Sequence, residues 1–357
     1  MIQRYLPVIL FPLIAFTVNL GVTPILIKLA NIIDLHDSPD HRKIHREPIS
    51  NFGGIGIFFS TVITCLIYGF FYIIPAKIML LLPGFSMIHI VGILDDRFDM
   101  KARYKLLFQI LSALIITLSG FIIKTVDIPF TDISIKMGYF SYFITIIWII
   151  SISNAINLID GIDGQAGGIS LIALLSIGVT LLLSGALIPA LLSFILAGCV
   201  SGFLIFNYPP AKVFMGDGGS LLLGFAIAVL PLLSGHGSIL PLAGPMTILV
   251  IPILDVFASI VRRRRKRQNL SMPDKEHTHH KLLDFGLSNR QILSIVYCFT
   301  GLFALISIYW SMERSVLAFI MILSSWVLSG SLFLILDRKY ETKVRAKRRL
   351  ENIRLIS

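Results

Sequence analysis

Long apolar stretches dominate this chain and limit the folds it can adopt. A helix needs about 20 apolar residues to cross a bilayer. Eleven stretches approach that length: 5–28, 53–74, 78–93, 106–123, 138–153, 167–184, 186–206, 219–234, 239–261, 291–310 and 316–336. Charged side chains make up only 14% of the chain, against about 25% in soluble proteins, which excludes a soluble globular domain. The sequence therefore predicts an all-α polytopic membrane protein with eleven transmembrane helices.

The positive charges lie mainly on one side of this topology. Eleven spans place the two termini on opposite sides, and the loops and tail on the C-terminal side hold 25 lysines and arginines, against 5 on the other side. Cytoplasmic loops carry such an excess. We therefore expect an outside N-terminus, a cytoplasmic C-terminus and an active site on the cytoplasmic face, where the polar loops lie. Topology also accounts for the net charge of +11, which does not indicate nucleic-acid binding.

We expect one membrane domain without a separate soluble part. Residues 1–336 are predicted to form a single integral-membrane domain, followed by a basic cytoplasmic tail over residues 337–357. No convincing internal repeat is present. The three cysteines lie in apolar stretches and imply no disulfide framework.

Two adjacent carboxylates, Asp95 and Asp96, end the third span, and Asp99 follows them. Neighbouring carboxylates at a membrane boundary repel each other unless a cation lies between them. They can present oxygens to Mg²⁺, with phosphate oxygens completing its coordination. The alternative is a solvated acidic cap that pairs with Arg97 and Arg103.

Two further polar loops contain carboxylates next to glycines. One has polar residues at every third position: Asn154, Asn157, Asp160 and Asp163. Packing beside a membrane does not require this pattern. In the other loop, Asp217 lies between glycines before a new span, a position that suits a metal or phosphate at a helix N-terminus. Phe214 in the same loop is either a membrane anchor or a stacking platform for a base.

A cationic cluster precedes the second span: Arg42, Lys43 and His45. The glycines at 53 and 54 allow a ligand to approach the backbone closely. The alternative for this cluster is the ordinary positive charge of a cytoplasmic loop.

Three histidines precede the tenth span: His277, His279 and His280. They suit either a transition-metal site or contacts to an anionic phosphate or sugar. The spacing of His277 and His280 predicts a shared helical face, with His279 pointing elsewhere. The arginine run at 262–267 suits anionic lipid, and we expect Asp255 to form a buried ion pair with Arg262.

Together these motifs resemble the polyprenyl-phosphate N-acetylhexosamine-1-phosphate transferase family, most closely its bacterial branch that makes undecaprenyl-pyrophosphoryl-N-acetylglucosamine. They occur in the family's order over residues of about 34–287. The resemblance implies transfer of an N-acetylhexosamine 1-phosphate from a UDP-sugar to undecaprenyl phosphate, with Mg²⁺, or Mn²⁺, as cofactor. It also implies a multi-pass protein of the bacterial cytoplasmic (inner) membrane, with UDP-N-acetylhexosamine, undecaprenyl phosphate and the lipid bilayer as partners.

The resemblance also assigns roles to individual residues. Asp217 matches the metal-binding aspartate, while Asp95 and Asp96 match the essential acidic pair, Asp96 also supporting the metal. Asp163 is expected nearest the uracil, and Phe214 becomes a candidate for stacking on it. The remaining predicted substrate-binding residues are Lys43, His45, Lys105, Asn154, Asn157, Asp160, Asn207, His277, His279 and His280.

Two other functions compete with this interpretation. The related phospho-N-acetylmuramoyl-pentapeptide transferases share the aspartate motifs, but they typically have Lys where this chain has Asp99 and three consecutive histidines where this chain has Thr278. A transporter would place charge at mid-span and on both faces. Here the middle of the spans has almost no charged or titratable side chains, with His89 and Asp255 as the main exceptions. The exact sugar, direct or double displacement, and the oligomeric state, including a homodimer, stay open.

Overall fold

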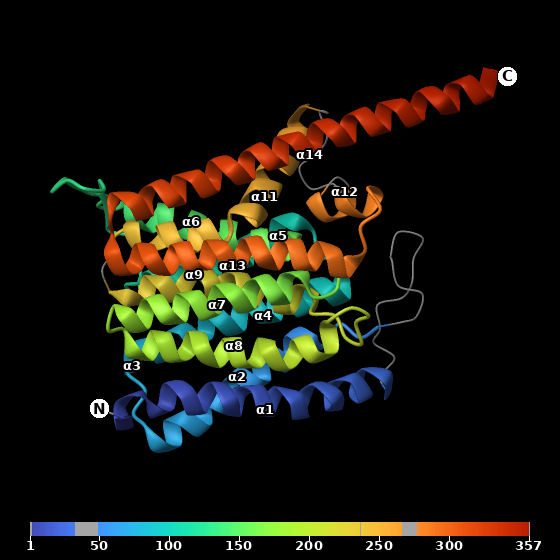
Figure 1. Cartoon of the computed structure of the whole chain (residues 1–357). Coiled ribbons are helices and arrows are strands. Elements are labelled where there is room, and N and C mark those ends of the chain that lie inside the picture. Colours follow the sequence, from blue (N-terminus) through green and yellow to red (C-terminus); the bar gives the residue numbers. More distant parts are fainter. Residues whose placement is uncertain (1, 33–48, 236, 266–276, 357) are drawn as a thin grey trace.

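The protein is a bundle of helices that run side by side (Figure 1), seen in a computed structural model that describes residues 2–32, 49–235, 237–265 and 277–356. The helices are α1 (Ile2–Ile32), α2 (Gly53–Phe71), α3 (Ala76–Met79), α4 (Leu81–Phe98), α5 (Ala102–Leu118), α6 (Phe140–Leu158), α7 (Gln165–Leu183), α8 (Leu187–Asn207), α9 (Gly216–Val229), α10 (Ala243–Ile248), α11 (Val250–Arg265), α12 (Thr278–Asp284), α13 (Asn289–Glu313) and α14 (Val316–Ile356). Two 3₁₀ helices follow α9: η1 (Leu230–Ser234) and η2 (Leu240–Leu242).

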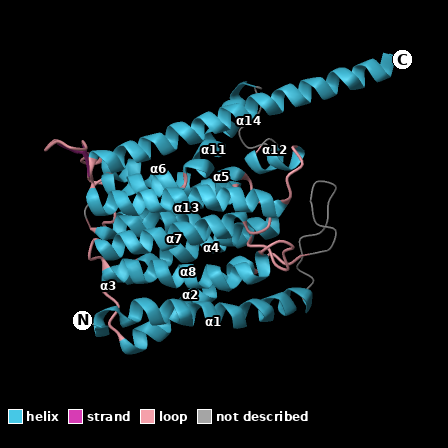
Figure 2. Cartoon of the chain, in the orientation of Figure 1, coloured by secondary structure: helices cyan, strands magenta, loops and turns pink. Residues whose placement is uncertain are grey.

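A small hairpin interrupts the helical pattern. Strands β1 (Thr125–Asp127) and β2 (Ser134–Lys136) pair antiparallel in the connection between α5 and α6. The connection lies at the end of the bundle opposite α12, on the left in Figure 2. The strict all-α prediction missed this hairpin, because six residues of strand are too few to give a clear alternating pattern.

Every one of the eleven apolar stretches contains a helix, so the prediction of a multi-pass membrane protein is confirmed. Within the described ranges, nine helical segments are long and apolar enough to cross a membrane, or ten if the bent pair around residue 249 is one span. Helix α5, with 17 residues, is shorter than these. The count of eleven spans and their orientation stay predictions.

The span predicted over residues 239–261 is not one straight helix. Two helical pieces, Leu240–Ile248 and Val250–Arg265, meet there at an angle of 78°. Pro252 explains the break, because it has no N–H for the carbonyl of Ile248 and its ring collides with that carbonyl. The bend changes the direction of α11, which carries Asp255.

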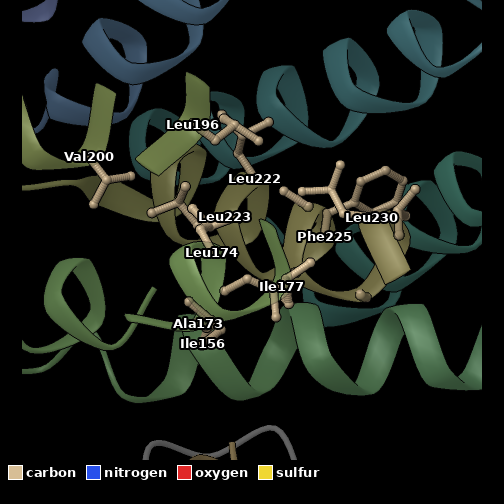
Figure 3. Close-up of a cluster of buried hydrophobic side chains, with 14 of the residues drawn as sticks. Ile156, Ala173, Leu174, Ile177, Leu196, Val200, Leu222, Leu223, Phe225 and Leu230 are labelled. Atoms are coloured by element: carbon tan, nitrogen blue, oxygen red, sulfur yellow. The ribbon is translucent and has the colours of Figure 1, made fainter. Parts of the chain in front are cut away.

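Helix α9 is the centre of the bundle. In the span that it forms with η1, 89% of the most apolar window is buried, against 22% for α1 and 17% for α14. A helix that is apolar on all sides is stable only when neighbours surround it, and α9 contacts α2, α4, α6 and α7. Figure 3 shows its side chains Leu222, Leu223 and Phe225 among those of α6, α7 and α8. Helix α9 is therefore held from several directions.

The last helix continues past residue 336 without a break and contacts α12. Lys281 of α12 is 2% exposed and forms an ion pair with Asp337. The hydroxyl of Tyr340 donates to Asp284 Oδ2 at 3.0 Å. The first turns of the predicted basic tail are thus part of the contact with the histidine-bearing segment.

Candidate active site

Four helix ends meet at one end of the bundle and bring distant polar residues together. The last turn of α4 carries Asp95 and Asp96, and the first turn of α5 carries Lys105. The last turn of α6 carries Asn157, and Asp217 is the second residue of α9. We call Asp95, Asp96, Lys105 and Asp217 the aspartate cluster.

A tight turn between α4 and α5 places Lys105 beside Asp95. Asp99 adopts the left-handed conformation, with φ of 47°, and its N–H donates to the carbonyl of Asp95. The chain then reverses within a few residues, so that Lys105 Nζ lies 2.7 Å from Asp95 Oδ2. The other oxygen of Asp95 accepts from the N–H of Met100 at 2.9 Å. Asp95 is therefore held by Lys105 and Met100, and not by Arg97 or Arg103 as in the alternative acidic cap.

Lys105 also forms an ion pair with Asp217 Oδ2 across 112 residues of sequence. The opposite oxygen, Asp217 Oδ1, accepts from Asn157 Nδ2 at 2.9 Å. The same amide nitrogen donates to the hydroxyl of Ser220 at 2.9 Å, one turn along α9. Asp217 is thus oriented by groups from α5 and α6 before any ligand arrives.

Asp96 accepts hydrogen bonds at the N-terminus of α9. Its carboxylate accepts from the N–H groups of Asp217, at 2.9 Å, and Gly218, at 3.3 Å. Unpaired N–H groups and the helix dipole favour negative charge at this position. These bonds fix α4 to α9, and they hold Asp96 next to Asp217.

Backbone contacts bring the same helices unusually close. The backbone of Gly92 in α4 touches that of Asp217 and Gly218, so a Cβ at Gly92 would collide with the main chain of α9. Gly54 of α2 makes the same kind of contact with Gly219. Among the residues that sequence reasoning did not assign to the site, His89 stands out, because its Nδ1 lies 2.9 Å from the carbonyl of Gly218. The feature of the sequence that pointed to His89 was the presence of a histidine within an apolar span.

The loop between α6 and α7 lies against this cluster. Burial, together with the charges of Asp217, Asp96 and Asp163, raises the pKa of Asp160 to about 8. A carboxyl group in such a position resists ionisation because too many negative charges share one region. The loop therefore brings a fourth carboxyl group into the field of the aspartate cluster.

Asn207 and Asp163 connect this loop to the loop before α9. Asn207 is 4% exposed, accepts from the N–H of Gly164 at 2.9 Å and donates to the carbonyl of Val213 at 2.8 Å. Asp163 Oδ2 accepts from the N–H of Ala211 at 3.0 Å. The structure thus gives both side chains a role in holding the two loops, while the predicted substrate contacts of both stay predictions.

Two further predicted residues have defined positions. Asn154 exchanges hydrogen bonds with Gln109 of α5, at 2.7 and 3.2 Å, which explains a polar glutamine within an apolar helix. Phe214 lies in the loop before α9, where its carbonyl accepts from the N–H of Gly53 at 3.0 Å. Both readings of its ring, as anchor or stacking platform, stay open. Lys43 and His45 lie outside the described residues.

The histidines form a second cluster around α11 and α12. Asp255 Oδ2 lies 2.9 Å from His277 Nδ1, and Asp255 Oδ1 accepts from the N–H and hydroxyl of Thr278, at 3.1 and 2.8 Å. The expected pairing of Asp255 with Arg262 was wrong, because His277 and Thr278 hold its carboxylate. We call Asp255, His277, His279 and His280 the histidine cluster.

The predicted shared face of His277 and His280 is also wrong. His277 precedes the helix in an extended conformation, so helical spacing does not apply to it. Its ring instead stacks with that of His279 at 6.0 Å. His279 is 2% exposed and lies against Gly161, while burial lowers its pKa to about 3. The histidine cluster therefore contacts the loop that carries Asp160.

The negative charge of the aspartate cluster is not balanced by its single lysine, and a divalent cation would balance it. Asp95 and Asp217 share the ammonium group of Lys105, while Asp96 accepts from backbone N–H groups. Burial, together with the neighbouring carboxylates, raises the pKa of Asp160. No group of three metal-ligand side chains is already in coordinating position within the part of the chain that the structure describes. Carboxylate oxygens of this kind are hard ligands that suit Mg²⁺ together with phosphate oxygens and water.

Comparisons with known proteins identify the family of this chain. The model of the family described as glycosyl transferase family 4 matches residues 77–235. The chain is 35% identical over 308 residues to the probable undecaprenyl-phosphate N-acetylglucosaminyl 1-phosphate transferase of Bacillus subtilis, covering 86% of each chain. It is 32% identical over 289 residues to the undecaprenyl-phosphate alpha-N-acetylglucosaminyl 1-phosphate transferase of Yersinia pestis, covering 79% of this chain and 78% of the relative.

A relative with a different lipid in its name is similar over a comparable length. The decaprenyl-phosphate N-acetylglucosaminephosphotransferase of Mycobacterium leprae is 30% identical over 307 residues, covering 77% of each chain. The whole aspartate cluster lies within the matched range of 77–235. With this identity and coverage, the chain belongs to glycosyl transferase family 4, and the predicted resemblance to the polyprenyl-phosphate N-acetylhexosamine-1-phosphate transferases is confirmed.

Proposed function

We propose that this chain transfers N-acetylglucosamine 1-phosphate from UDP-N-acetylglucosamine to undecaprenyl phosphate, giving undecaprenyl-pyrophosphoryl-N-acetylglucosamine and UMP. The observation that carries the proposal is the bridge of Lys105 between Asp95 and Asp217, where three helix ends meet. Phosphoryl transfer depends mainly on positioning and on neutralising charge. The names of the relatives support the sugar and the lipid class.

In the proposed reaction an oxygen of the lipid phosphate attacks the β-phosphorus of the nucleotide sugar. The bond from that phosphorus to the oxygen bridging the two phosphates breaks, and UMP leaves with the bridging oxygen. One pyrophosphate bond replaces another, so the reaction needs neither ATP nor a redox cofactor. Two anionic reactants must meet, which is unfavourable unless cations lie between them.

In this proposal Asp217 and Asp96 hold Mg²⁺, with Mn²⁺ as an alternative. When bound, the ion neutralises phosphate charge and polarises the phosphorus–oxygen bonds. Asn157 keeps Asp217 oriented through its 2.9 Å hydrogen bond. Lys105 turns from Asp217 to a phosphate when substrate enters, since an ammonium group can serve either anion.

The other polar residues complete the proposed site. Asp95 orients the lipid phosphate or takes a proton from it. The loop from Asn154 to Asp163 contacts the nucleotide sugar, with Asp163 nearest the uracil. His277, His279 and His280 contribute to the choice of sugar, and His279 does so through its contact with Gly161.

We place this site at the cytoplasmic face of the bacterial inner membrane, in a topology of eleven spans. The support is the distribution of 25 lysines and arginines on the side of the polar loops, against 5 on the other. The end of α14 and the aspartate cluster lie at the same end of the bundle, because α14 contacts α12 and His279 of α12 contacts Gly161.

Release of UMP tests the proposal. Purified protein in detergent is mixed with undecaprenyl phosphate, Mg²⁺ and one of several UDP-sugars, including UDP-N-acetylmuramoyl-pentapeptide. We expect UMP from UDP-N-acetylglucosamine, only with both lipid phosphate and divalent cation. Preference for the pentapeptide donor would favour the related transferases, and transport of a sugar without UMP release would favour a transporter.

A further inference from the structure

A cavity of about 480 Å³ lies among the helix connections that face away from the aspartate cluster. Its walls are formed by residues of α3, of the segment after α5, of the turn between α7 and α8, and of η1. None of these residues takes part in the proposed reaction. The cavity is therefore a separate feature of the molecule.

Two of the helices that meet at the aspartate cluster lead to this cavity. Helix α5, which carries Lys105 in its first turn, is followed by Gly120 and Phe121 in the wall, and α9, which carries Asp217 in its first turn, leads to Leu232. The 17 residues of α5 rise by about 26 Å, at about 1.5 Å per residue. That length is close to the hydrocarbon core of a bilayer, about 30 Å. The cavity therefore lies near the lipid headgroups of the opposite leaflet.

The cavity carries positive charge. Lys77 and Lys124 line it, and none of its described lining residues is acidic. Among the ion pairs of the described residues, neither ammonium has a carboxylate partner. Lys77 Nζ lies 4.7 Å from the centre of the Phe121 ring, which holds it at the rim.

The remaining wall is apolar and open. Leu187, Ile188 and Leu232 contribute aliphatic side chains. Gly185 has a φ of 80° and faces open space, since an added Cβ would meet nothing within 4 Å. Two cations above aliphatic walls match a molecule with an anionic head and a hydrocarbon body.

We propose that this cavity binds an anionic phospholipid of the leaflet opposite the aspartate cluster. Its phosphate lies between Lys77 and Lys124, and its glycerol and upper acyl carbons lie along Leu187, Ile188 and Leu232. Inorganic phosphate shares the anionic chemistry, but it would leave the apolar walls uncovered. The site does not depend on the proposed transferase activity.

Native mass spectrometry of the full chain tests this site without an activity measurement. Detergent-purified protein is titrated with phosphatidylglycerol or with phosphatidylcholine. We expect phosphatidylglycerol to be retained more strongly, and the double variant Lys77→Gln/Lys124→Gln to bind it about tenfold more weakly, since each lysine near a lipid surface contributes measurably. Lys136→Gln is the matched control, because Lys136 is exposed at the same end of the bundle but does not line the cavity.

Three results would overturn the proposal: equal retention of the two lipids by the unaltered protein, unchanged phosphatidylglycerol binding in the double variant, or the same loss in Lys136→Gln. Complete displacement of phosphatidylglycerol by inorganic phosphate would show a simple anion site instead. Circular dichroism checks that the double variant folds. If it does not, the comparison of the two lipids on the unaltered protein decides.

Discussion

The aspartate cluster and the histidine cluster lie at the same end of the bundle but differ in how their charges are balanced. In the aspartate cluster, Asp95 and Asp217 share one lysine, Asp96 accepts from backbone N–H groups, and the Asp217 side chain is 31% exposed. In the histidine cluster, Asp255 is 1% exposed and fully occupied by His277 and Thr278. The first cluster has unbalanced charge to offer a ligand, whereas in the second the carboxylate is already paired and both ring nitrogens of His279 are buried without a hydrogen-bond partner among the described residues.

This difference separates two ways in which polar residues contribute to a membrane enzyme. An under-neutralised cluster is costly in the unliganded protein, and a cation or substrate relieves that cost. A buried carboxylate with its partners in place, as at Asp255, fixes the position of a segment, and removing it leaves unpaired groups inside the protein. Substitutions in the first should therefore affect turnover, and substitutions in the second should affect stability.

Asp217→Asn should give the largest effect. We expect kcat to fall about a thousandfold, because the change removes a charged ligand at the proposed metal site. UMP release at saturating Mg²⁺ measures the loss. Asp132→Asn is the control, because Asp132 is exposed and lies between β1 and β2, in the hairpin opposite α12. Near-normal turnover of Asp217→Asn would remove it from the metal site.

Asp255→Leu should affect stability more than chemistry. The change leaves His277 and Thr278 without their acceptor, and breaking a buried pair of this kind costs about 3 kcal/mol of unfolding free energy. Thermal unfolding in detergent should show the loss, while the remaining folded protein keeps turnover within about tenfold. Unchanged stability with turnover as low as that of Asp217→Asn would make Asp255 part of the chemistry and erase the contrast between the clusters.

Asp337→Asn should have a smaller effect on stability. Lys281 loses its ion pair but keeps the rings of Phe333 and Tyr340 within 6 Å of its ammonium. We expect a loss of about 2 kcal/mol, typical of a buried charged donor that loses its partner. Thermal unfolding is compared with Asp132→Asn. An unaltered melting temperature would mean that α12 does not depend on α14.

Acidification should give the smallest effect, through His279. Its pKa is about 3 in the folded protein against 6.5 when unfolded, so its stabilising contribution is complete above pH 6.5 and falls as the pH drops toward 3. At pH 5.5 the loss is about 1.4 kcal/mol. His279→Gln should remove this part of the difference in unfolding between pH 7.5 and pH 5.5. An identical difference in the variant would assign the acid sensitivity to another group.

The helical spans could be predicted because apolar length alone defines them. The bend between the two helical pieces at residues 248–250 could not be predicted, because a proline inside a membrane helix is often tolerated without such a bend. The third span was predicted to end at residue 93, but α4 continues to Phe98, so that Asp95 and Asp96 are helical. Lys105 beside Asp95 and the N–H groups of α9 beside Asp96 compensate for negative charge at the end of a helix.

The site residues were predicted from their types, but their partners were not. Lys105 and Asp217 are separated by 112 residues, and a single sequence gives no measure of contact between them. The prediction that His277 and His280 share a helical face was wrong for a different reason. The helix starts one residue after His277, so helical spacing does not apply to that residue. Gly92 showed no signal at all, since its importance arises only where α9 crosses α4.

The glycine contacts near the aspartate cluster have a mechanical consequence. Helices tilt when membrane thickness changes, and they rotate about the point where they are fastened most closely. For α2, α4 and α9 that point is the backbone contact at Gly54, Gly92 and Gly219, beside Asp217. A change of tilt should therefore move the opposite ends, including the segment around Lys77, while the spacing of the carboxylates is preserved. The helices are therefore fixed most firmly beside the reactive groups, and their opposite ends have more freedom to move.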